Sequence, residues 1–306
     1  MTASQNSAIS VSSDYKPQLQ QRYKIDQFFQ TIAWIATFSG LIVLTVLIIS
    51  ILVRGLPTLS LDFLTSPPSR QPDRAGIWPA FVGSIILLLI TAAVSIPIGI
   101  GTGIFLQEFA QNNKWAQVIE VNISNLAAVP SIIYGLLGLF VFARLFIFAT
   151  GGRSILSGGL TLALLILPVI IVATREALKS VPDSIRQAGM ALGATRWQTV
   201  RTHVLPQAIP GIMTGTILAL SRAIGETAPI IAVGAAAFVP FAPTLTVEGL
   251  QEPAFTALPI QIFNWVSRPQ EEFHAIAASA IIVLMIMLMV MNATAIFIRN
   301  RFQSSL

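Results

Sequence analysis

The feature of this sequence that most limits its fold is a set of long apolar runs. An α-helix needs about 20 consecutive apolar residues to cross the hydrocarbon core of a bilayer. Six runs of about that length or longer occur, at residues 28 to 53, 79 to 107, 125 to 148, 155 to 174, 208 to 233 and 274 to 298. They predict an all-α integral membrane protein with six transmembrane helices.

The composition agrees with a membrane protein and excludes several other classes. Of 306 residues, 54% are hydrophobic and 10% are charged, whereas about a quarter of a soluble domain is charged. The chain has no cysteine, which excludes disulfides, thiolate metal ligands and cysteine nucleophiles; we expect no metal site. No Gly-Lys dipeptide occurs, so the phosphate-binding loop of nucleotide hydrolases is absent. We therefore expect no cofactor on this chain, and any ATP and Mg²⁺ to be bound by a partner.

The net charge of +5 is better explained by membrane topology than by nucleic-acid binding, because the basic residues are spread over separate loops. If both termini are cytosolic, the inside segments hold eleven lysines and arginines and the outside segments hold five. Cytosolic loops carry the excess of positive charge. We therefore predict cytosolic termini and no nucleic-acid partner. The polar segment 183 to 206 then lies in the cytosol.

The apolar runs and the segments between them predict four parts of the chain. Residues 1 to 24 are polar and rich in serine and glutamine, which predicts a disordered cytosolic tail. Residues 25 to 76 hold the first transmembrane helix and an outside loop. Residues 77 to 298 form the main membrane domain, and residues 299 to 306 form a second cytosolic tail.

Two outside segments leave alternatives open. The loop at 54 to 78 contains four prolines and is either a plain connector or a contact for an extracytoplasmic partner. The stretch from 234 to 273 is long for a loop and contains apolar and aromatic residues. It either re-enters the membrane edge or docks a soluble protein. By contrast, Glu108, Lys114 and Glu120 are expected in an ordinary solvated loop.

The polar segment 183 to 206 has the pattern of two short helices with a bend between them. Apolar residues recur at helical spacing on each side of the bend, namely Ile185, Ala188 and Leu192, then Trp197, Val200 and Val204. Gly193 can take the left-handed backbone that ends a helix, and Thr195 to Gln198 has the form of a capping box. Leu205-Pro206 is expected to close the second helix. His203 is expected on the wet face.

A helical hairpin that is apolar on one side favours a partner groove. The alternative is an amphipathic hairpin on lipid head groups, with Arg186, Arg196 and Arg201 facing phosphate.

Arg222 and Glu226 lie within the fifth apolar run, four residues apart. A charged side chain deep in the bilayer is energetically unfavourable unless it is paired or faces a polar cavity. Arg222 and Glu226 are therefore candidates for a transport path. The guanidinium of Arg222 can donate two parallel hydrogen bonds to an oxyanion. Glu226 can accept the O–H of hydrogen phosphate and repel a fully ionised anion such as sulfate. The alternative is a purely structural salt bridge.

The polar segment resembles the EAA loop of ABC-importer permeases, whose pattern is Glu-Ala-Ala, three residues, Gly, nine residues, Ile, one residue, Leu-Pro. Gln187, Ala188 and Gly189 occupy the triplet, His203 the isoleucine position, and Gly193 and Leu205-Pro206 the remaining positions. The spacing matches throughout, while the residue types depart at Gln187, Gly189 and His203. The resemblance implies coupling helices that dock on an ATPase subunit through Gln187, Ala188, Gly189, Gly193, Ala194, Thr195, Trp197, Leu205 and Pro206.

The strings PSIIYGLLGLF at 130 to 140 and SRAIGETAP at 221 to 229 are similar to the A-type permease of phosphate-specific ABC transporters. This resemblance implies the type I importer permease (MetI-like) fold and a role for Arg222 and Glu226 in transport. It also implies a second permease subunit of the C type, two ATPase subunits, an extracytoplasmic phosphate-binding protein and a site in the bacterial inner membrane. The alternatives are a permease for sulfate or molybdate, and an autonomous anion channel or secondary transporter.

Overall fold

The computed structural model describes residues 19–110 and 114–303, and all regular elements within these ranges are helices. The chain divides into two compact units, Met1–Ser50 and Ile51–Leu306. Residues 1 to 18 of the predicted N-terminal tail lie outside the described residues, as do residues 304 to 306 of the C-terminal tail. The described parts of both tails, 19 to 24 and 299 to 303, belong to helices.

The first unit consists of one helix, α1 (Leu19–Gly55), whose last residues belong to the second unit. It is apolar around its whole circumference after its first turns, which is the composition of a membrane span. It is the one element among the described residues of its unit, and these give it no packing partner there.

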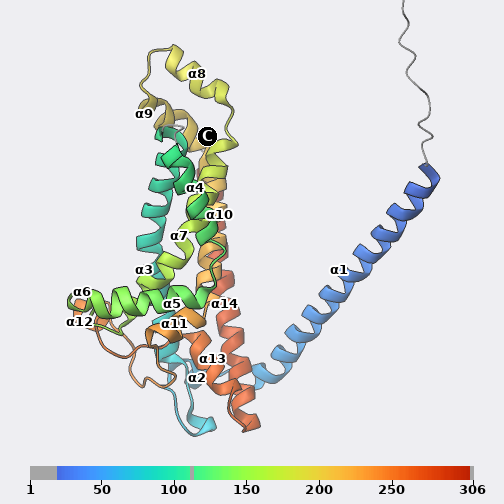
Figure 1. The fold of residues 1–306 in the computed structure, drawn as a ribbon. Coiled ribbons are helices and arrows are strands. Elements are labelled where there is room, and N and C mark those ends of the chain that lie inside the picture. Colours follow the sequence, from blue (N-terminus) through green and yellow to red (C-terminus); the bar gives the residue numbers. More distant parts are fainter. Residues whose placement is uncertain (1–18, 111–113, 304–306) are drawn as a thin grey trace, which may run out of the picture. The chain divides into compact units, whose positions relative to one another are not determined.

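The second unit contains four long helices that run side by side, α3 (Trp78–Ile104), α7 (Ile155–Lys179), α10 (Leu205–Gly225) and α14 (Glu271–Gln303) (Figure 1). The shorter helices are η1 (Leu56–Thr58), α2 (Leu61–Thr65), η2 (Pro72–Arg74), η3 (Phe105–Phe109), α4 (Lys114–Leu126), α5 (Ser131–Phe140), η4 (Val141–Leu145), α6 (Ile147–Thr150), α8 (Asp183–Ala191), α9 (Arg196–Thr199), η5 (Val200–Val204), α11 (Ala228–Val233), α12 (Val247–Leu250) and α13 (Leu258–Val266). Helices α8 and α9 lie at one end of the bundle, which we call the hairpin end. Helices α2, α12 and α13 lie at the opposite end (Figure 1).

Five of the helices are long and apolar enough to cross a membrane, and a bent pair brings the number to six if it counts as one span. The prediction of an all-α protein with six apolar segments is therefore confirmed. The third segment is not the uninterrupted helix expected at 125 to 148, because its two parts meet at 104°. Pro130 at the junction has no N–H to continue a helical ladder. The hydroxyl of Tyr134 donates to Leu126 O at 2.8 Å and bridges the bend.

Small residues let the central helices approach closely. A side chain at Gly103 of α3 would place its Cβ 2.6 Å from the Cβ of Thr174 on α7. On the other side of α7, a Cβ at Gly215 of α10 would lie 2.2 Å from that of Ala173. Gly211 and Gly215, four residues apart on α10, therefore form a packing surface for α7. The resulting core includes Ile166, which is fully buried.

The two outside segments with open alternatives are both folded against the bundle. The ring of Phe63, from the loop after α1, lies 6.1 Å from the ring of Trp265 in α13, and both side chains are buried with Phe273 of α14. Part of the stretch from 234 to 273 is thus used in packing within the protein, whereas six of its large apolar residues stay exposed, namely Phe238, Phe241, Leu245, Val247, Phe263 and Val266. Its four glutamates stay exposed.

The close approach of α3 to α7 predicts different effects for two glycines of α3. Gly103→Ala forces a methyl group against Thr174 and the carbonyl of Ile171, and overpacking of this kind costs about 1–3 kcal/mol. Gly101→Ala meets no atom within 4 Å and gains helix propensity of up to ~1 kcal/mol. Thermal unfolding of the two purified variants in detergent measures the difference. Equal melting temperatures would contradict the packing described here.

Candidate functional site

The hairpin between α7 and α10 has the local structure that its sequence predicts. Helix α8 ends before Gly193, whose φ of +85° is the left-handed conformation that favours glycine. The next helix begins with a complete capping box. The Thr195 hydroxyl accepts from the N–H of Gln198 at 3.3 Å, and the Gln198 side chain accepts from the N–H of Thr195 at 2.8 Å. These two devices fix the bend.

Gly189, at the third position of the triplet, has a steric role. It is buried at the point where α8 crosses the second helix of the hairpin, and a Cβ there would lie 2.7 Å from the methyl group of Thr199. The departure from alanine at this position therefore allows the two short helices to pack closely.

The two predicted apolar stripes do not form one exposed face, which corrects the expectation from helical spacing. Val200 and Val204 are fully buried against the bundle and Ile185 is half-buried, whereas Leu192 is 89% exposed. The reason is that the second helix packs against the ends of α7 and α10, so its inward-facing apolar side chains are buried there. The outer surface of the hairpin consists instead of Gln187, Ala188, Met190, Leu192 and Trp197, all of them exposed. His203 is exposed as expected.

Leu205-Pro206 does not close the second helix, contrary to prediction. The N–H of Leu205 bonds to Val200 O five residues back, which makes η5 a π-turn. A π-turn supplies one extra residue, so Pro206 enters the first turn of α10 without breaking the chain of helical residues. One helix of 30 residues therefore runs from Arg196 to Gly225 and joins the hairpin to the interior of the bundle.

Glu108 does not lie in a solvated loop, which corrects the prediction from its sequence neighbourhood. It lies on η3 at the hairpin end of α3, is 2% exposed, and pairs with Arg186 of α8 at 2.6 Å. This hydrogen bond, with smaller contributions from the charges of Glu108 and Asp183, raises the pKa of the Arg186 guanidinium. Arg186 is therefore charged at any cellular pH and is turned inward, not toward lipid phosphate.

Glu120 is also paired, with Arg175 at 2.8 Å, and this contact joins α4 to α7. Lys114 is exposed as expected, but it and Glu120 lie on the helix α4 and not in a loop. No sequence signal marks either ion pair, because the partners are 78 and 55 residues apart in the chain.

The fifth apolar run is broken at the charged pair. Helix α10 ends at Gly225, and Glu226 has an extended backbone with φ −78° and ψ 112°. Pro229, in the first turn of α11, lacks an N–H, and its ring would clash with the carbonyl of Gly225 in a continuous helix. The prediction of one helix over 208 to 233 is therefore wrong, and Glu226 leads away from the helix that carries Arg222.

Arg222 and Glu226 nevertheless meet, with Nε 3.1 Å from Oε1. The Arg222 side chain is 50% exposed and that of Glu226 is 19% exposed. Among the described residues, only the Nε of the guanidinium bonds to this carboxylate. The two terminal nitrogens therefore remain available to a ligand from the open side.

Two polar groups near Arg222 carry no signal in the sequence. Oδ1 of Asn292 on α14 accepts a hydrogen bond of 2.7 Å from the hydroxyl of Ser221, the residue before Arg222, and the charge of Arg222 acts on Tyr134 of α5. Both come from helices that are distant in the chain, so spacing along the sequence does not reveal them.

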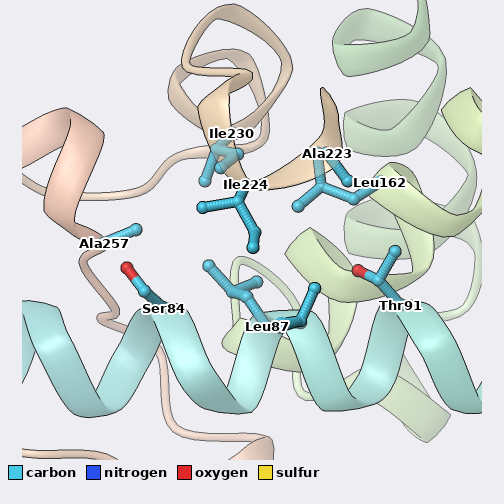
Figure 2. A pocket seen from close by; sticks show the side chains of 9 residues that line it. Ser84, Leu87, Thr91, Leu162, Ala223, Ile224, Ile230 and Ala257 are labelled. Carbon is cyan, nitrogen blue, oxygen red and sulfur yellow. The ribbon is translucent and has the colours of Figure 1, made fainter. Parts of the chain in front are cut away.

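The inner side of the helix break is closed to an anion. A cavity of about 10 Å³ lies there between Ile224, Ile230 and α3 (Figure 2), which is room for about one water molecule. The two polar side chains that line the cavity already form hydrogen bonds within the protein. Ser84 accepts from the N–H of Leu258, and Thr91 donates to Gly159 O. An oxyanion can therefore reach Arg222 only from the exposed side.

Residues 95–305 match the family described as the inner membrane component of binding-protein-dependent transport systems. The chain belongs to this family. It is 40% identical over 182 residues to the probable ABC transporter permease protein YqgI of Bacillus subtilis, a match that covers 59% of this chain and 60% of that relative. It is 32% identical over 276 residues to the phosphate transport system permease protein PstA of Xylella fastidiosa, which covers 89% of this chain and 92% of the relative.

Solved transporters share the fold of this permease. A crystal structure of a bacterial ABC transporter that imports the polysaccharide alginate matches with a TM-score of 0.64 and 14% identity, over 92% of this chain and 98% of that one. An inward-facing structure of the MetNI methionine transporter matches with a TM-score of 0.53 and 17% identity, over 74% and 94%. At these identities the likeness concerns the fold alone, and it confirms the predicted MetI-like architecture.

The left-handed backbone at Gly193 predicts how the hairpin responds to substitution. Gly193→Val places a branched side chain in a conformation that costs about 1–2 kcal/mol for most residues, while Gly193→Asn tolerates it better. We expect faster amide hydrogen exchange across residues 183 to 199 in the valine variant and near-normal exchange in the asparagine variant. Equal protection in both would show that the bend does not depend on this conformation.

Proposed function

We propose that this chain is a transmembrane permease subunit of an ATP-driven importer of inorganic phosphate in the bacterial inner membrane. In the proposed topology both termini and the hairpin end face the cytosol. The observation that carries the proposal is the full-length similarity to permeases named for phosphate transport, in a chain that places an open arginine at its helix break.

The charged pair suits hydrogen phosphate. The terminal nitrogens of Arg222 can donate two parallel bonds to phosphate oxygens, while the carboxylate of Glu226 can accept the remaining O–H. A fully ionised sulfate has no proton to offer and would meet the carboxylate as a like charge. The guanidinium of Arg222 is the more exposed of the two groups, so an incoming anion would meet it before the more buried carboxylate of Glu226.

The proposed partners occupy the two ends of the bundle and its flank. Two ATPase subunits bind ATP and Mg²⁺, and one of them receives the outer surface of the hairpin, with Ala194 and Thr195 at its bend. A second permease subunit of the C type pairs with this chain along the membrane. An extracytoplasmic phosphate-binding protein docks at the opposite end. This chain itself performs no bond chemistry.

The continuous helix supplies a mechanism for coupling. ATP binding closes the ATPase dimer and displaces the hairpin. Because the helix from Arg196 to Gly225 is uninterrupted, the displacement reaches Arg222 at its far end and opens the path to the outside. ATP hydrolysis resets the helix.

Reconstitution in proteoliposomes tests the proposal. We expect phosphate uptake only when both permeases, the ATPase, the binding protein and ATP are present. The matched control contains the permeases alone with a phosphate gradient. Phosphate flux through the permeases alone would indicate a channel or a secondary transporter instead.

Glu226→Gln tests the proposed selectivity. Loss of the negative charge should lower the preference for phosphate over sulfate by about tenfold, which corresponds to ~1.4 kcal/mol. This preference is measured as the ability of sulfate to compete with labelled phosphate for uptake. The assay includes a binding protein for each of the two anions. Glu252→Gln, which removes an exposed carboxylate at the opposite end, is the control. Unchanged phosphate uptake and an unchanged preference in Glu226→Gln would show that the proposed role of the carboxylate is wrong.

A further inference from the structure

We propose that Arg186 and Glu108 form a permanent clamp that makes the hairpin and the ends of α3 and α7 move as one body. Both are positioning residues, which act through the helices they join and not on the transported ion. The inference rests on the proposed function, since it names the contact through which a push on the hairpin enters the bundle.

The Arg186 guanidinium joins three segments. Toward α3 it donates to Glu108, with Nη2 2.6 Å from Oε1 and Nε 3.2 Å from Oε2. Toward the end of α7 it donates to Leu178 O at 2.9 Å and to Val181 O at 2.8 Å. Within α8 it contacts Asp183 at 3.1 Å. One side chain thus spans the short connection between α7 and α8 and fixes both ends of it.

Burial makes this contact difficult to open. Glu108 is 2% exposed and the Arg186 side chain is 16% exposed, so separation would cost the carboxylate its charged partner at a position with little access to solvent. The fork of charge-assisted bonds also fixes orientation as well as distance. A surface ion pair such as Lys179 with Glu176, with both side chains largely exposed, has neither property.

Apart from Arg186, α8 is joined to the bundle by Ile185, which packs against the buried cluster that includes Leu178, Val181 and Val204. The outer surface of α8 is exposed, and its buried contact through Gly189 is made with the second helix of the hairpin. At the α3 end, Phe109 meets Trp197 at 6.0 Å and Arg196 at 5.9 Å, and these also belong to the second helix. Without Arg186, only the apolar contacts of Val181 and Ile185 would hold α8 against the bundle, and α8 would yield more to a push instead of transmitting it.

Loss of the clamp should separate ATP hydrolysis from transport in the assembled importer. In Glu108→Gln and Arg186→Lys we expect the ATPase subunits to bind and hydrolyse ATP, while the phosphate taken up per ATP falls by at least about tenfold, or ~1.4 kcal/mol of coupling. Glu120→Gln is the matched control, because it breaks an ion pair to α7 that does not involve the hairpin. Normal phosphate uptake per ATP in Glu108→Gln would overturn the proposal.

Chemical rescue distinguishes a clamp from a general loss of folding. The chain has no cysteine, so Glu108→Cys with Arg186→Cys creates a unique pair of thiols when the partner subunits are cysteine-free. A cavity of about 250 Å³ borders both positions, and a short bis-methanethiosulfonate cross-linker is the reagent chosen to join the two thiols across it. We expect low phosphate uptake per ATP before cross-linking, recovery after it, and loss again after reduction. Cross-linked protein that hydrolyses ATP but stays uncoupled would overturn the clamp, because the pair would then have to open during transport.

Failure of the proposed function and failure of the clamp give different results. If the unmodified importer takes up no phosphate with all its partners and ATP, the proposed function is wrong. If the unmodified importer works and both the substitution and the cross-linking experiments give equal coupling, only the clamp is wrong.

Discussion

The architecture depends on the burial of one carboxylate at the hairpin end of the bundle. Glu108 has almost no access to water, and a buried charge without a partner is strongly destabilising, by about 3–5 kcal/mol when its partner is removed. Arg186 meets this requirement only when α8 lies across the ends of α3 and α7. The ion pair thereby fixes the position of the hairpin. The hairpin in turn fixes the start of the helix that runs to Gly225.

Two prolines then have opposite effects on the path from the hairpin to the charged pair. The π-turn before Pro206 accommodates this proline, so the helix that begins at Arg196 continues to Gly225. Pro229 has no such turn before it, and the helix stops four residues earlier, at Gly225. The helix is continuous up to this break, which places Arg222 near its end; in the proposed mechanism this is the end that moves. Glu226 lies beyond the break, so a small shift of the helix can change the separation of the two charges.

Local features of this protein are predictable from the sequence, and contacts between distant segments are not. The capping box at Thr195 and the left-handed Gly193 follow from short-range backbone chemistry. The apolar runs follow from the length needed to cross a bilayer. The pairing of Glu108 with Arg186 joins residues 78 positions apart, and no pattern of spacing marks it. The exposed face of the hairpin also differs from its prediction, because periodicity identifies an apolar stripe but not what covers it.

The central claim is that the hairpin and the long helix form one rigid body, and a distance measurement tests it most directly. Spin labels introduced by Ala191→Cys and Leu218→Cys occupy exposed positions on the hairpin and on α10. Pulsed electron paramagnetic resonance of the assembled importer should give the same distance distribution without nucleotide and with trapped ATP. In the same states, a label pair between Leu218→Cys and the second permease should change its distance. A shift between the hairpin and α10 of more than about one helical pitch, ~5.4 Å, would contradict the account.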